Sequence, residues 1–311
     1  PYFTYYFEPG DGYLGGDFFF PKNKTADCIA FLEKTPNPER SVVVHHMAVS
    51  GQIIASGGGV CNCLLHPSVR QAVHGRYEKA MQAELAWCLN HIDDEFRKEL
   101  KTVYEALRPE KTEKVDFEAV FLSAKKLLEN HEVKILVMNG KHDVDSSEYS
   151  VGSNIVIGGN TLGRGVTFPA LHTIYYTRTS KKPQADTMWQ HSRMFGYDRD
   201  PGMMKVYIDE PLYKLFSDIN ATNNSIISQI EKGAENIKVY YPKGLNPTRA
   251  AVLDNKSVFA LSGGTNYYPF DPDNNGIEDL DNLLAVFDDK EPSYQVSLRL
   301  MKEIFSHITS A

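Results

Sequence analysis

The chain has 311 residues, of which 42% are hydrophobic and 23% are charged, and this composition excludes a disordered or fibrous protein. Its 33 Lys and Arg against 40 Asp and Glu give a net charge of −7. That balance excludes a protein that binds nucleic acid over its whole surface, although it leaves room for a local basic track. No apolar run reaches the roughly 18 residues that a membrane span needs, so no membrane partner is expected.

The cysteines indicate the compartment. Cys28, Cys61, Cys63 and Cys88 are too few and too unevenly spaced for a disulfide framework, and none has the C-x-x-C spacing of a zinc site. We therefore expect a reducing, cytoplasmic location and no metal site. Cys61 and Cys63 alternate in an apolar run, which predicts two buried thiols on one face of a strand. The sequence begins at Pro1 without a signal peptide, so we expect it to be a piece of a longer protein.

Residues 1–59 are dense in aromatic residues and glycine but lack sustained periodicity. We predict loops and a linker that pack against another part of the protein. Within this segment, His45 and His46 lie in the apolar stretch 42–49, where neighbouring residues would point to opposite faces. They are therefore predicted to be structural and not to share a metal.

The next part of the chain has clear periodicity. The apolar run 60–65 predicts a buried strand that ends at His66-Pro67-Ser68. Apolar residues at helical spacing then predict a helix from Val69 to Ile92, a second over about 93–107 and a third after Pro109. We interpret about 69–131 as a helical insertion.

Short apolar runs alternate with helical or glycine-rich connections after this insertion, at 133–138, 154–157, 172–176 and 204–208. Strands joined by crossovers predict an α/β protein with a parallel sheet and helices on both faces. A helix is expected over 211–232, capped by Gly233. Residues 236–311 are predicted to form an appended extension, with a strand at 239–241, an acidic turn-rich segment and a final helix near 294–308.

A glycine-rich loop follows the strand at 155–157 and holds Thr161, Arg164 and Thr167. In an open parallel sheet, ligands bind beyond the carboxyl ends of the strands. Backbone N–H groups and the Arg164 guanidinium would suit phosphate oxygens there. The alternative is that the glycines only provide the φ angles that the loop requires.

A second charged element, the segment 186–199 of sequence DTMWQHSRMFGYDR, follows the strand at 172–176. Gln190 and Arg193 are three residues apart, so a helix would project both from one face. The alternative is a surface helix whose arginines are solvated or paired with Asp186 and Asp198. Because the two elements occupy successive crossovers of one sheet edge, their side chains could converge on one anion.

Together the two segments resemble motifs five and six of superfamily two helicases, and specifically the Z-one domain of ATPases associated with restriction endonucleases. The sequence is similar to the family pattern almost residue for residue between Gly158 and Tyr197. Asn62 to Ser68, with His74 downstream, resembles the family's strand-His-x-Ser element. Tyr13-Leu-Gly-Gly16 is similar to the stretch that leads out of the first lobe. The resemblance covers about residues 10–235.

The resemblance implies a RecA-like second motor lobe over 60–235, with 1–59 leading from a first lobe and 236–311 as a C-terminal extension. Arg193 and Arg199 match the arginines that reach the γ-phosphate of ATP, and Gln190 matches a residue at the nucleotide. The arginines lie three and nine residues after Gln190, where helicases at large have four and seven, so the identity of the arginine finger stays open. Gly163, Arg164, Gly165 and Thr167 match the family's loop that couples the nucleotide to the nucleic acid. Ser68, Thr161 and Arg164 match the positions at which the family contacts nucleic acid.

One nucleotide-binding element is absent from the sequence. It contains no G-x-x-x-x-G-K-[ST]. We expect this chain alone to hold neither ATP nor Mg²⁺, both of which would belong to the full-length protein with its upstream first lobe. The other expected partners are DNA and a nuclease subunit or fused nuclease domain.

Two further patterns are weaker. Asp116 with Glu132-Val-Lys134 has the residue types of a metal-dependent nuclease, but a helix and a buried strand are predicted there, so we attribute the match to chance. Asp271-x-Asp273-x-Asn275-Gly276 resembles the opening of an EF-hand loop but has Asn282 at the twelfth position. A solvated acidic loop is expected.

The sequence thus predicts half of a nucleic-acid-dependent, helicase-like ATPase that acts with a restriction or defence endonuclease. A docking module without catalytic function and a self-contained phosphate-ligand enzyme remain as alternatives. For Ser68, a role as N-cap of the helix predicted from Val69 is an alternative to phosphate binding.

Overall fold

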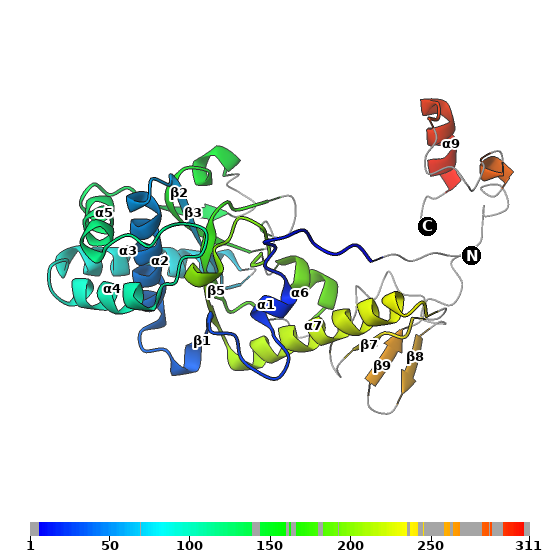
Figure 1. Ribbon diagram of the computed structural model, residues 1–311, viewed down its shortest axis with the longest axis horizontal. Helices are drawn as coiled ribbons and strands as arrows, with labels where there is room; N and C mark the ends of the chain where they lie inside the picture. Colours follow the sequence, from blue (N-terminus) through cyan, green and yellow to red (C-terminus); the bar gives the residue numbers. More distant parts are fainter. Residues whose placement is uncertain are drawn as a thin grey trace.

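A six-stranded, entirely parallel sheet forms the main body of the computed structural model (Figure 1). The strand order is β1-β6-β5-β2-β4-β3. The strands are β1 (Ile29–Phe31), β2 (Val60–His66), β3 (Val133–Met138), β4 (Gly152–Gly158), β5 (Leu171–Tyr176) and β6 (Lys205–Ile208). The structure describes residues 6–68, 70–138, 144–159, 162, 166–179, 183–191, 193–234, 237–241, 245, 258–261, 264–267, 282–285, 287 and 295–307.

The central strands are buried on both faces. All six residues of β5 are buried, as are the last six residues of both β2 and β4. This explains why they are continuous apolar runs in the sequence and not alternating ones. The predicted α/β, RecA-like parallel sheet with helices on both faces is confirmed, and the four strands expected after residue 131 lie at β3, β4, β5 and β6.

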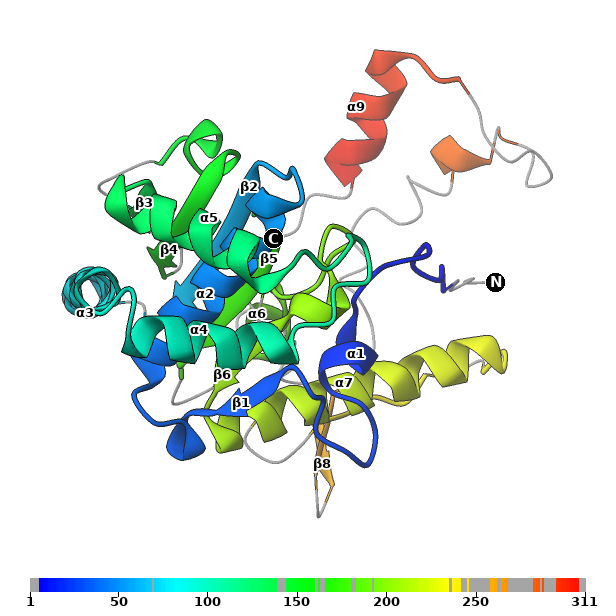
Figure 2. The ribbon, with the colours of Figure 1, turned by 60° about the vertical axis from the view of Figure 1, so that its left-hand side comes forward.

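Four helices cover one face of the sheet (Figure 2). They are α2 (Pro38–Ala55), α3 (Gln71–Asn90), α4 (Glu95–Ala106) and α5 (Phe117–Glu129). Helices α2 and α5 approach so closely that a Cβ on Gly51 would lie 2.5 Å from the Val120 carbonyl oxygen. Cys61 and Cys63 belong to this core and are buried, as their alternation predicts.

The opposite face is covered by α1 (Gly16–Phe19), α6 (Ala185–His191) and α7 (Glu210–Glu231). Alternate strand residues such as Leu64, Val156 and Ile174 point into this second core. Phe20 of the N-terminal segment stacks on Phe216 of α7, with ring centroids 5.5 Å apart. The two cores together fix the sheet between two helical layers.

The N-terminal 59 residues differ from the prediction of loops and linker. β1 pairs in parallel with β6 at the sheet edge, and α2 is buried without interruption from Val42 to Ile53. A helix that is buried on every side needs no amphipathic period, so periodicity could not reveal it. His45 and His46 lie in this helix and not in an extended stretch.

Both histidines are buried and hydrogen-bonded, which confirms the expected structural role. The Nδ1 atom of His45 lies 2.8 Å from Thr173 Oγ1, and the Nε2 atom of His46 lies 2.9 Å from Ser153 Oγ. Burial lowers the pKa of His46 to about 3. Both side chains are therefore neutral parts of the core.

Short helices η1 (Leu32–Lys34), η2 (Ser146–Tyr149) and η4 (Pro201–Met203) complete the main body. Beyond it, β7 (Tyr240–Tyr241), β8 (Val258–Leu261) and β9 (Gly264–Tyr267) form an antiparallel sheet, and α9 (Leu298–His307) lies apart from the large sheet in both views (Figures 1 and 2). The EF-hand-like residues Asp271, Asp273, Asn275 and Gly276 lie outside the described residues. Within the described part of the chain, no helix combines the length and apolar character needed to cross a bilayer.

Candidate functional site

The turn formed by residues 193–200 joins α6 to η4 and carries both candidate arginines. Arg193 has a φ of 52°, in the left-handed region that residues with a side chain rarely adopt. Such a conformation persists only where the surrounding structure holds it. The contacts of this turn therefore decide how each arginine is presented.

The guanidinium of Arg199 is buried with a bond from each of its three nitrogens, and the residue is 4% exposed. Its Nε donates to the carbonyl oxygen of Met194 at 2.9 Å, and its Nη2 donates to that of Arg193 at 2.9 Å. Its Nη1 pairs with the Asp198 carboxylate. Burial lowers the pKa of Arg199, and Asp198 opposes that shift. All three nitrogens of this side chain thus hold the turn.

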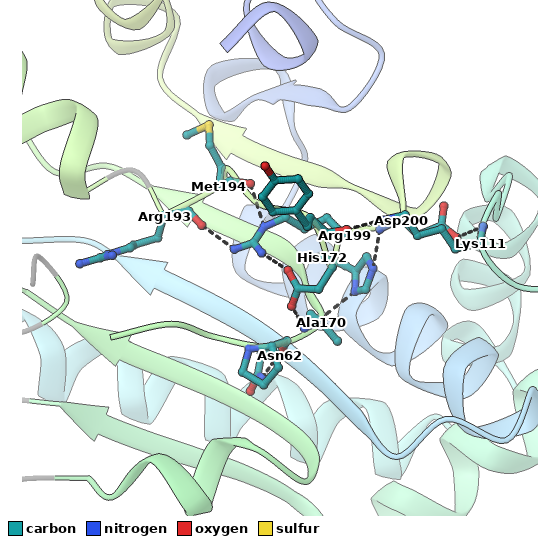
Figure 3. Close-up of polar contacts among 11 residues, drawn as sticks. Asn62, Lys111, Ala170, His172, Arg193, Met194, Arg199 and Asp200 are labelled. Carbon is teal, nitrogen blue, oxygen red and sulfur yellow. Dashed lines mark hydrogen bonds and ion pairs between the residues drawn. The ribbon is translucent and has the colours of Figure 1, made fainter. Parts of the chain in front are cut away.

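Arg193 is presented differently. Its side chain is half-buried, and its Nε donates to the carbonyl oxygen of Leu162 at 2.5 Å. This bond joins the glycine-rich loop after β4 to the turn. Among the described residues, no acceptor bonds the two Nη groups, and Figure 3 shows the guanidinium extending away from Arg199. Burial lowers the pKa of Arg193.

A pocket of about 390 Å³ opens between this turn and the segment that precedes β5. It brings together four of the residues predicted from the sequence, Thr167, Gln190, Arg193 and Arg199. Its lining consists of Val166, Thr167, Phe168, Trp189, Gln190, Arg193, Phe195, Gly196, Tyr197, Asp198 and Arg199.

The N-terminal segment supports the far wall of the pocket. Leu14 and Gly196 exchange two backbone hydrogen bonds of 2.9 and 3.2 Å. Next to this bridge, the ring centroids of Tyr13 and Tyr197 lie 4.9 Å apart. The Tyr197 hydroxyl also accepts a hydrogen bond from the Gly10 N–H at 3.1 Å. A stretch far away in the sequence is thus part of the same site.

A chain of hydrogen bonds continues from Arg199 toward β5 and η4 (Figure 3). Asp198 accepts from the Ala170 N–H at 2.7 Å, while the Ala170 carbonyl lies 2.9 Å from Nδ1 of His172. The Nε2 of His172 accepts from the Asp200 N–H at 3.0 Å. Because Nε2 accepts, Nδ1 carries the proton and the ring is neutral. Burial lowers the pKa of His172 to about 4, which agrees with this assignment.

Five further residues were predicted for the site. Thr161, Gly163, Arg164 and Gly165 are outside the described residues. Ser68 is not in the pocket but follows β2, where its carbonyl oxygen lies 2.6 Å from Nε2 of His74.

The N-cap predicted for Ser68 is also corrected. Helix α3 begins at Gln71 with Arg70 as N-cap, and the Ser68 hydroxyl accepts from the Arg70 N–H instead. The helix start is therefore later than its apolar spacing indicates, and the hydroxyl stabilises the turn that precedes it.

The nuclease-like residues have ordinary structural positions. Asp116 caps α5 by accepting from the Ala119 N–H at 3.2 Å, and Lys134 is exposed on the edge strand β3. In the described ranges, no group of three or more His, Cys, Asp or Glu side chains is placed to hold a metal ion.

The sequence of the chain matches two known families. Residues 44–248 match the model of the Z1 domain. The chain belongs to the Z1 domain family. This match begins within α2 and includes the pocket and its turn, so it confirms the family identified from the two sequence motifs. Residues 261–311 of this Z1 protein match the C-terminal domain of the restriction endonuclease CglI H-subunit, and the two matches associate it with restriction systems. No curated protein matches the chain.

Sequence reasoning missed the residues that support the turn. His172 was part of a predicted buried strand, and nothing in its spacing distinguishes it from a core residue. Asp200 precedes Pro201-Gly202, a pattern typical of a capping aspartate at a turn, and this signal was available. Only the pairing of an arginine with Asp198 was foreseen, as the alternative to a functional role.

Proposed function

We propose that this Z1 domain is the second lobe of a nucleic-acid-dependent, helicase-like ATPase that serves a restriction endonuclease, and that Arg193 is its arginine finger. The observation that carries this proposal is the contrast between the two arginines. Arg193 lines an open pocket with its Nη groups uncommitted among the described residues, whereas Arg199 is buried with all three nitrogens bonded.

The pocket suits one end of a phosphate chain. A half-buried guanidinium, the Gln190 amide and the Thr167 hydroxyl lie around one cavity, and arginine binds phosphate oxygens with paired hydrogen bonds. Bound ATP, with its Mg²⁺, would supply a γ-phosphoryl group whose developing negative charge an arginine stabilises during transfer. The P-loop that holds the rest of ATP would come from the first lobe of the full-length protein.

The nucleic-acid side of the proposal rests on the loop after β4. Arg193 bonds Leu162 of this loop. Thr161 and Arg164 are one and two residues from Leu162 in the sequence, so a DNA contact made by either would act on the loop that holds the finger. Ser68 lies beside the same loop, because a Cβ on Gly159 would lie 2.9 Å from the Ser68 carbonyl oxygen. We assign DNA binding to this edge of the sheet.

Substitution in the full-length protein tests the proposal. Arg193→Ala should lower kcat for ATP hydrolysis by at least about tenfold with a much smaller change in nucleotide affinity, because a finger acts on transition-state charge. The exposed Lys34→Ala is the control, since Lys34 pairs with the exposed Glu210 and neither residue lines the pocket. Equal kcat values for the two variants would exclude Arg193 as the finger.

Calorimetric titration of ATP into the 311-residue chain is a second arm of this experiment. The chain should bind ATP weakly or not at all, because it lacks a P-loop. A tight, Mg²⁺-dependent complex would favour a self-contained phosphate-ligand enzyme instead.

A docking module is a second candidate, and one observation favours it. Within the residues that match the H-subunit domain, α9 leaves Leu298 70% and Met301 43% exposed. Such apolar side chains on one short helix suit a partner protein. If docking is the main role, Leu298→Glu with Met301→Glu should abolish association with the nuclease subunit, measured by analytical ultracentrifugation, while Arg193→Ala should leave DNA cleavage unchanged.

A further inference from the structure

The loop between α4 and α5 is attached to the turn that carries Arg193. The Asp200 carboxylate, on a residue 2% exposed, accepts from the Glu110 N–H at 3.0 Å and from the Lys111 N–H at 2.8 Å. It also accepts from the Gly202 N–H at 3.0 Å, which caps η4. One buried carboxylate thus holds main-chain donors from two segments that are far apart in the sequence.

Direct main-chain contact reinforces this attachment. The Arg108 N–H donates to the Gly202 carbonyl at 2.8 Å, and a Cβ on Gly202 would overlap the Arg108 carbonyl oxygen. The Lys111 ammonium donates to the Tyr197 carbonyl. The loop therefore contacts the turn at Tyr197 and η4 at Gly202, on either side of Asp200.

The attachment continues to Arg193 through the hydrogen bonds already described (Figure 3). The Asp200 N–H is bonded to His172, and the path ends where Arg199 donates to the Arg193 carbonyl. Arg193 needs this support because residues with a side chain rarely adopt its left-handed backbone conformation. The path runs in order through Asp200, His172, Ala170, Asp198, Arg199 and Arg193.

We propose that Asp200 is a positioning residue that couples the helical insertion α3–α5 to Arg193, so that displacement of the 108–111 loop displaces the guanidinium in the pocket. The proposal rests on the proposed function insofar as Arg193 contacts the transferred phosphoryl group. The insertion then regulates hydrolysis, because a ligand that shifts α4 or α5 shifts the finger with it.

Asp200→Asn in the full-length protein tests the coupling. An asparagine amide presents N–H groups where three main-chain donors need acceptors. We expect kcat for ATP hydrolysis to fall at least fivefold with KM changed less than twofold. Asp145→Asn is the matched control, since Asp145 also caps a short helix by accepting from the Ser147 N–H but is itself exposed; it should keep the wild-type kcat.

A spectroscopic readout separates positioning from stability. In the 311-residue chain, Trp87 and Trp189 are the two tryptophans, so Trp87→Phe in this chain leaves Trp189, in the pocket wall, as the single reporter. Asp200→Asn should shift the emission of Trp189 at temperatures well below unfolding, whereas Asp145→Asn should not. A lowered melting temperature with unchanged emission and unchanged kcat would overturn the proposal and make Asp200 a scaffold residue only.

A second variant tests the coupling between the 108–111 loop and Arg193 if Asp200→Asn does not fold. Gly202→Ala keeps the carboxylate but forces the Arg108 carbonyl away, and Gly75→Ala in α3, where a Cβ meets no atom within 4 Å, is its control. Gly202→Ala should lower kcat and shift Trp189 emission, and wild-type values for both would overturn the proposal. If Arg193→Ala itself leaves kcat unchanged, the proposed function fails, and the emission of Trp189 still tests the coupling.

Discussion

The two ends of the 193–200 turn have opposite surroundings. At Arg199 the guanidinium is buried and its three nitrogens donate to Met194, Arg193 and Asp198. At Arg193 one bond, to Leu162, fixes the side chain while its end faces a pocket. Identical side chains six residues apart thus have different roles, and the number of donors already bonded distinguishes a side chain that supports the fold from one that can bind a ligand.

The largest expected effect is on stability at the closed end. Arg199→Ala should lower the free energy of unfolding by about 3 kcal/mol, because it removes a buried charged donor and leaves two main-chain carbonyls and Asp198 without their partner. Arg193→Ala should lower it by about 1 kcal/mol, the value of one hydrogen bond. Urea unfolding of both variants measures the difference, and equal losses would mean that the two ends of the turn do not differ as described.

The second effect concerns pH and the neutral His172. Its pKa is about 4 in the folded protein against about 6.5 in the unfolded chain, so the unfolded chain binds more protons between these values. Stability from this group is therefore complete well above pH 6.5 and is lost as the pH falls toward 4, by about 2.5 kcal/mol at pH 4.5.

The variant His172→Gln isolates this contribution. Glutamine offers an oxygen that can accept from the Asp200 N–H, yet it does not titrate. Because His45 and His46 also have lowered pKa values, the informative quantity is the difference in unfolding free energy between wild type and variant. This difference should shrink as the pH falls from 7 to 4.5, and a constant difference would show that His172 is not held neutral.

The smallest effect is expected at the exposed contact beside the pocket. Tyr197 is 54% exposed, so Tyr197→Phe, which removes its bond to the Gly10 N–H, should cost only about 0.5 kcal/mol. Hydrogen exchange of the Gly10 amide should nevertheless become faster. Tyr6→Phe, in the same segment, is the control. Equal exchange rates of the Gly10 amide in both variants would mean that the Leu14–Gly196 bridge alone holds this segment against the turn.

The sequence predicted the sheet well because its strands are buried on both faces. Runs such as 155–157 and 174–176 are apolar without interruption and belong to the buried strands β4 and β5. The sequence did not predict α2 because the helix is buried on every side, which removes the contrast from which periodicity is recognised. It did not predict β1 because a strand of three residues is too short to show a period.

The sequence predicted which residues form the candidate site but not that Arg199 would serve to hold the turn. Thr167, Gln190 and Arg193 were expected together and lie in one pocket. The sequence could not show that Arg199 is a support, because two of its three acceptors are main-chain carbonyls that only the folded turn brings into reach. Nor could it show that Asp200 bonds the loop at 110–111, a contact between segments about 90 residues apart.

The bond between Gly10 and Tyr197, separated by 187 residues, also has a consequence during synthesis. At about 5–20 residues per second, the N-terminal segment leaves the ribosome about 10–40 s before its partner on the turn. Phe19 remains without Phe195 and Phe20 without Phe216 for that time, although each pair packs together in the finished protein. The wall behind Arg193 is therefore completed late in translation, and until then the nascent chain presents an aromatic segment that a chaperone can bind.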